Sequence, residues 1–74
     1  MVPVGTTGII RKGRWGEGWQ IRIEDESGGY LILYSRDFTN REAEAYDGWA
    51  ANEEELAVQL RDFEIDWGSI PKAS

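Results

Sequence analysis

The chain has 74 residues, of which 41% are hydrophobic and 30% are charged, and its formal net charge is −6. A chain of this length forms one small domain, whose modest core leaves little room for an enclosed active-site cavity. Because the sequence contains neither cysteine nor histidine, it excludes disulfides, thiolate metal sites and catalysis by imidazole.

The charges are unevenly distributed along the chain. Residues 1–22 have a net charge of +3, whereas residues 23–74 have a net charge of −9. The acidic part is expected to repel nucleic acid and to attract basic partners. The N-terminal residues lack the basic start of a signal peptide, and no stretch approaches the roughly 18 apolar residues of a membrane span. We therefore expect a cytoplasmic protein with no membrane partner.

A first strand is predicted over residues 6–12, where β-branched residues lie between glycines. The next segment, residues 13–18, contains three glycines in six residues. It lacks the lysine and the Ser/Thr ending of a phosphate-binding P-loop, and no helical pattern follows it. This segment is predicted to be a mobile connection between strands.

Two strand-like runs follow, at residues 19–24 and 30–34. The first run alternates, with Trp19, Ile21 and Ile23 on one face, which predicts a strand with one buried face. The second run is apolar on both faces, which is typical of a central strand.

The turn between these runs sets the register of the hairpin. A two-residue loop at Ser27 and Gly28 would pair Ile23 with Ile32 and Ile21 with Tyr34. A three-residue loop would shift the register by one residue and move Leu31 and Leu33 to the core face. The first register is preferred.

Residues 36–51 show neither a clean alternation nor a sustained helical stripe, and they are predicted to form a long connection. Tyr46 and Trp49 argue against disorder because bulky aromatic side chains around an Asp-Gly turn favour packing. We expect this connection to be fixed to the body of the domain or presented to a partner.

A helix is predicted from Asn52 to about Asp62. Asn52 can cap the helix, Glu55 can complete a capping box, and acidic residues suit the positive end of the helix dipole. One stripe of the helix should pack on the sheet, formed by Leu56, Leu60 and Phe63, with Gln59 beside it. A last strand is expected over residues 63–67, followed by a flexible tail over residues 69–74.

The predicted order is β-β-β-α-β, in a single α+β domain covering residues 1–68. The first three strands form an antiparallel meander, and the sheet packs on one helix. Strong bending of this sheet would turn it into a small SH3-like barrel.

No group in the sequence points to catalysis. Two acidic pairs are available, Asp25 with Glu26 and Glu64 with Asp66, but the first lies at a hairpin tip and the second on the polar side of a strand. Both are better interpreted as solvated surface acids. We expect a protein that is not an enzyme, with no metal site and no cofactor, since no segment has the ligand spacing of a calcium loop.

An acidic surface is the more distinctive feature of the second half of the chain. Carboxylates steer an encounter with a basic protein, and an exposed aromatic side chain anchors it. The predicted protein-binding residues are Tyr46, Asp47, Trp49, Glu53, Glu54, Glu64 and Asp66. An equally ranked alternative is a solubilising acidic face with both aromatic side chains buried in the core.

A basic cluster near the first loop supports a second hypothesis, a small SH3-like regulatory domain that binds nucleic acid. The cluster consists of Arg11, Lys12, Arg14 and Trp15, which could contact phosphates and stack on bases. The alternative interpretation is a strand edge protected by charges. The net charge of −6 weighs against binding to a long polyanion.

Several segments of the chain resemble small acidic bacterial immunity-type proteins, which neutralise secreted toxins, many of them nucleases. The resemblance covers about half of the chain, and it rests on residues 29–34, residues 46–49, the acidic capped helix and residues 64–67. It implies a cytoplasmic inhibitor whose carboxylates occupy the nucleic-acid site of a toxin domain. Members of this group share a role more than a fold, so no functional residue carries over.

Overall fold

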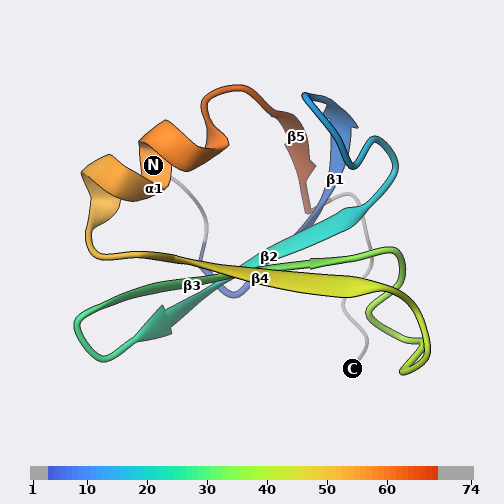
Figure 1. Ribbon diagram of the computed structural model, residues 1–74, viewed down its shortest axis with the longest axis horizontal. Helices are drawn as coiled ribbons and strands as arrows, with labels where there is room; N and C mark the ends of the chain where they lie inside the picture. Colours follow the sequence, from blue (N-terminus) through green and yellow to red (C-terminus); the bar gives the residue numbers. More distant parts are fainter. Residues whose placement is uncertain (1–3, 69–74) are drawn as a thin grey trace.

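The computed structural model describes residues 4–68. These residues form one antiparallel sheet and one helix. The elements in chain order are β1 (Thr7–Lys12), β2 (Gln20–Glu26), β3 (Gly29–Ser35), β4 (Ala45–Ala50), α1 (Glu53–Leu60) and β5 (Glu64–Trp67). The strand order across the sheet is β4-β3-β2-β1-β5. Strands β1 and β5 run at a steep angle to the other strands (Figure 1). The α+β class, with an antiparallel meander packed on one helix, is confirmed.

The register predicted for the hairpin is also confirmed. Ile21 lies opposite Tyr34 and Ile23 lies opposite Ile32, as a two-residue turn requires. Gly28 in this turn has a φ of 83°, a left-handed conformation that glycine adopts without steric cost. Strand β3 lies between β2 and β4 and is therefore central, as its two apolar faces indicated.

The prediction of a long connection over residues 36–51 is wrong in its second half, which forms strand β4. This strand pairs along its whole length with β3. Its residues do not alternate between apolar and polar, because one face carries Tyr46, Gly48 and Ala50 and the other combines Asp47 with Ala45 and Trp49. Pairing with the apolar central strand β3 decides the conformation of β4. The pattern of the residues in β4 alone cannot indicate this pairing.

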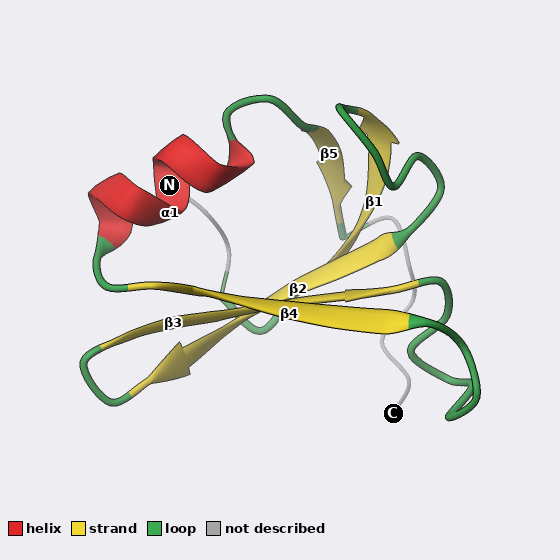
Figure 2. Ribbon diagram, viewed as in Figure 1, coloured by secondary structure: helices red, strands yellow, loops and turns green. Residues whose placement is uncertain are grey.

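Strands β4 and β5 are the two edges of the sheet, so within residues 4–68 the sheet remains open and does not close into an SH3-like barrel. We call the face that packs against α1 the inner face and the opposite one the outer face (Figure 2). The core lies on the inner face and contains Ile10, Ile21, Ile23, Ile32, Tyr34, Ala50, Leu56 and Leu60. Each fully buried isoleucine stabilises the fold by about 1.5–3 kcal/mol relative to exposure.

The start of α1 has the predicted cap. Asn52 Oδ1 accepts a hydrogen bond of 2.9 Å from the Glu55 amide, and Glu55 Oε1 accepts one of 3.3 Å from the Ala51 amide. The second bond closes one residue earlier than in the standard capping box. The helix ends at Leu60 rather than Asp62, because the Phe63 amide bonds back to the Leu60 carbonyl and turns the chain toward β5.

The remaining boundaries agree closely with the predicted ones. β5 begins one residue later than predicted and pairs with β1. The predicted flexible tail, residues 69–74, lies outside the described residues, as do residues 1–3. In the part of the chain that the structure describes, no helix has the length and apolar character needed to cross a membrane.

Candidate functional site

The seven predicted protein-binding residues do not form one patch. Glu64 and Asp66 belong to β5, whereas the others lie on β4 and at the start of α1, and the two strands are opposite edges of the sheet (Figure 1). On β5 the acids face bases of β1: Asp66 forms an ion pair of 2.9 Å with Arg11, and Glu64 lies opposite Lys12. Because bases of β1 balance the acids of β5, this edge does not contribute to an acidic surface.

The pairing of Tyr46 with Trp49 as one anchor is also wrong. They are three residues apart on a strand, so their side chains project from opposite faces. The Tyr46 ring stacks on Trp19 at the inner face, with centroids 5.5 Å apart. The Trp49 ring packs against Gly29 instead. The alternative that both are buried is wrong as well, because Tyr46 is 56% exposed and Trp49 is 48% exposed.

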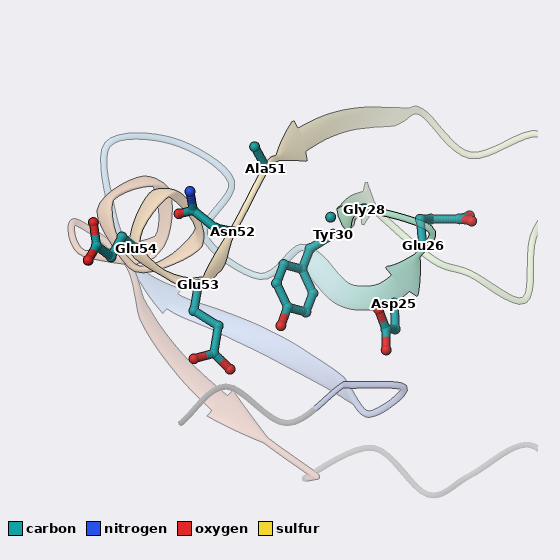
Figure 3. Close-up of a pocket in the computed structure, with 9 residues that line it drawn as sticks. Asp25, Glu26, Gly28, Tyr30, Ala51, Asn52, Glu53 and Glu54 are labelled. Atoms are coloured by element: carbon teal, nitrogen blue, oxygen red, sulfur yellow. The ribbon is translucent and has the colours of Figure 1, made fainter.

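The structure brings together a different group of acids, beside the hairpin tip. An open depression of about 610 Å³ separates the β2–β3 turn from the beginning of α1. We call it the acidic groove; its side chains include Asp25, Glu26, Tyr30, Glu53 and Glu54. In Figure 3, the Tyr30 side chain lies between those of Glu53 and Asp25, while Glu26 and Glu54 point outward at the two ends. No lysine or arginine is among the described residues that line it.

Strand pairing explains why these acids meet. Tyr30 lies opposite Ala50 in the β3–β4 register, so the end of β4 and the start of α1 lie beside the hairpin tip. Sequence reasoning treated Asp25 and Glu26 only as solvated acids and did not connect them with the helix. Each of the two acidic clusters can be recognised in the sequence. Their proximity depends on strand β4, which was not predicted.

The negative potential of the groove is reflected in Tyr30. Desolvation raises the pKa of its hydroxyl above the ordinary value of 10.0, and the charges of Glu53 and Asp25 raise it further. A hydrogen bond to the Glu53 carboxylate acts in the same direction, because only the protonated hydroxyl can donate. The charges of Glu53 and Asp25 therefore disfavour a further negative charge beside Tyr30 and favour a cation.

Trp49 lies on the outer face of the sheet and contacts one residue of the groove. Gly29 lines the groove and is also the residue against which the indole ring packs. A Cβ atom at position 29 would overlap Trp49 Cζ2 and lie 2.6 Å from the Ala50 carbonyl oxygen, so the close approach requires glycine. Asp47 projects from the same face of β4 as Trp49. The exposed indole thus shares its face of β4 with the Asp47 carboxylate and contacts a glycine that lines the groove.

The basic cluster predicted for nucleic acid is largely engaged within the protein. Arg11 bonds to Asp66, and Arg14 Nε lies 3.5 Å from Asp62 Oδ2. Lys12 is exposed and lies opposite Glu64 in the β1–β5 register. These carboxylates reduce the positive potential that a phosphate backbone would need.

Trp15, in the same cluster, packs among four other rings. Its centroid lies 4.9 Å from that of Tyr34, 5.5 Å from Trp19, 5.9 Å from Phe63 and 6.1 Å from Tyr46. Gly13 permits this packing, because a Cβ at that position would overlap the Phe63 ring. Packing of the Trp15 side chain thus anchors the glycine-rich connection to the body of the domain.

Comparisons with known proteins identify no family for this chain. No family model matches it, and neither the curated proteins nor the solved structures give a significant match. The resemblance to immunity-type proteins therefore stays a prediction. Among residues 4–68, no group of three or more acidic side chains is arranged to hold a metal ion.

Proposed function

We propose that this chain is a non-enzymatic protein-binding domain that recognises a basic partner through the acidic groove and Trp49. The observation that carries the proposal is the groove itself, where two distant segments place the Asp25 and Glu53 carboxylates on either side of Tyr30, with Glu26 and Glu54 at the two ends and no lining base among the described residues. A lysine or arginine of the partner would meet opposite charges there, among them Glu53 and Asp25, whose charges also contribute to the raised Tyr30 pKa.

Charge alone does not provide tight binding. Exposed ion pairs contribute about 0–1 kcal/mol each, whereas a desolvated aromatic anchor contributes about 2 kcal/mol or more. Trp49 has the required exposure, and its ring packs against Gly29, one of the residues that line the groove. In this proposal the carboxylates steer the partner and the indole holds it.

A cytoplasmic inhibitor of the immunity type is the specific form that we propose for this function. A nuclease toxin presents a basic surface to its nucleic-acid substrate, and an acidic groove can occupy such a surface. A toxin encoded beside this chain would be the first partner to test. The predicted residues Trp49, Glu53 and Glu54 remain in the proposed interface, and Asp25, Glu26 and Tyr30 join them.

The test compares two charge-reversal variants that have the same net charge. The groove variant carries Glu53→Lys and Glu54→Lys, and the control carries Glu17→Lys and Glu42→Lys, at exposed positions outside the groove. Affinity captures from an extract of the source organism are compared, after circular dichroism has shown that each variant is folded. Partners recovered by the wild type and the control should be lost with the groove variant. Equal recovery by all three proteins would contradict the proposal.

A further inference from the structure

Among residues 4–68, one edge of strand β4 is unpaired. It is the outermost strand of the described sheet and pairs with β3 on one side only. The Trp49 carbonyl points to the other side, where it accepts a hydrogen bond of 2.6 Å from Gln59 Nε2. Because backbone groups alternate in direction along a strand, the N–H and C=O groups of Ala45 and Asp47 point to this side too.

The two edges of the sheet differ in their protection. β5 has four residues, in which acidic and apolar side chains alternate. Its Asp66 forms an ion pair with Arg11 of the neighbouring strand. β4 has six residues, contains neither proline nor lysine, and carries a single charge, on Asp47. Long edges without such protective features are templates for pairing with another chain. Helix α1 reaches this edge at its Trp49 end, through Gln59.

Exposed aromatic side chains flank this edge on both faces of the sheet. Tyr46 projects from the inner face and Trp49 from the outer face, and both are about half exposed. A partner resting on either face would contact only one of them. A strand added beside β4 would place its alternate side chains next to both.

We propose that the β4 edge binds an extended segment of a partner protein by strand addition. The segment would carry a lysine or arginine beside Asp47 and apolar side chains against Tyr46 and Trp49. The inference rests on the proposed function, since it supplies the docking mode of the same basic partner. A second copy of this chain is a poor occupant, because pairing centred on Asp47 would place two carboxylates opposite each other and the copy carries a like net charge of −6.

The test uses linear random peptides displayed on phage as the probe. Peptides selected on the immobilised chain are synthesised and titrated into nitrogen-15-labelled protein. Selected sequences should contain a lysine or arginine between apolar residues, and the amide shifts should change most over Ala45–Ala50. Methylating the peptide amides that face β4 should weaken binding roughly tenfold or more, because each removes a backbone hydrogen bond, whereas methylating the alternate amides should have little effect.

Two protein variants complete the test. Asp47→Lys should reduce the affinity for the selected peptides, and Asp47→Pro should abolish binding by removing an edge N–H, a substitution that edge strands tolerate. If Asp47→Pro fails to fold, the methylated peptides and Asp47→Lys still decide the question. Binding that is lost with Glu53→Lys and Glu54→Lys but unaffected at Asp47 would overturn strand addition while supporting the groove. Failure to select any peptide that perturbs β4 would also overturn it.

Discussion

Gln59 Nε2 donates a hydrogen bond of 2.6 Å to the Trp49 carbonyl oxygen and so joins helix α1 to the edge strand β4. Gln59→Ala should lower the free energy of unfolding by about 0.5–1.5 kcal/mol, because it removes a donor from a backbone acceptor. Gln59→Glu keeps the length of the side chain but not the donor, and it should cost a similar amount. Urea denaturation measures both. Wild-type stability in the glutamate variant would show that the contact is one of packing.

Gly29 and Gly48 lie on adjacent strands but tolerate a side chain differently. Gly29→Ala should destabilise the fold by about 1–3 kcal/mol, because the new methyl group would overlap the Trp49 ring and the Ala50 carbonyl. Gly48→Ala is the matched control, since the nearest atoms to its Cβ would lie at 3.6 Å and 3.9 Å. Thermal unfolding of the two variants compares them directly. Equal melting temperatures would refute the close approach of Trp49 to β3.

Trp15 and Trp49 are both partly exposed, but they have different surroundings. Trp15→Ala should destabilise the fold by about 2–3 kcal/mol, because four rings lose their central contact. Trp49→Ala should cost less, and its main effect should be on partner binding. Denaturant titrations give the stabilities, and near-ultraviolet circular dichroism should lose its strongest aromatic signal only with Trp15→Ala. A larger loss of stability at Trp49 would reverse this assignment.

Tyr30 should titrate above its ordinary pKa of 10.0, since desolvation, Glu53 and Asp25 all favour the protonated hydroxyl. A raised pKa in the folded state means that this contribution to stability is present below the unfolded value and is lost as the pH rises through the folded value. Tyrosinate absorbance of the wild type minus that of Tyr30→Phe isolates the titration.

Glu53→Gln tests the cause of this shift. The substitution removes one of the charges that raise the Tyr30 pKa, so the titration should move toward 10.0. Glu17→Gln, outside the groove, should leave it unchanged. A Tyr30 pKa at or below the ordinary value in the wild type would argue against a negative potential in the groove.

Local patterns determined much of the fold. The two-residue turn at Ser27 and Gly28 specified the pairing of Ile21 with Tyr34, because a slip of one residue would move the apolar side chains to the wrong face. Asn52 marked the start of the helix, since its side chain can satisfy a first-turn amide. Such features depend on neighbours a few residues away along the chain.

The sequence by itself thus determined the α+β class, the hairpin register, the helix cap and the acidic balance of the chain. Only the tertiary structure decided that residues 45–50 form an edge strand, that Tyr46 and Trp49 occupy opposite faces, and that Asp25 and Glu53 flank Tyr30. The physical reason is that each of these relationships arises from the pairing of β4 with β3, a contact between segments distant in the chain that gives β4 a conformation its own residues do not specify.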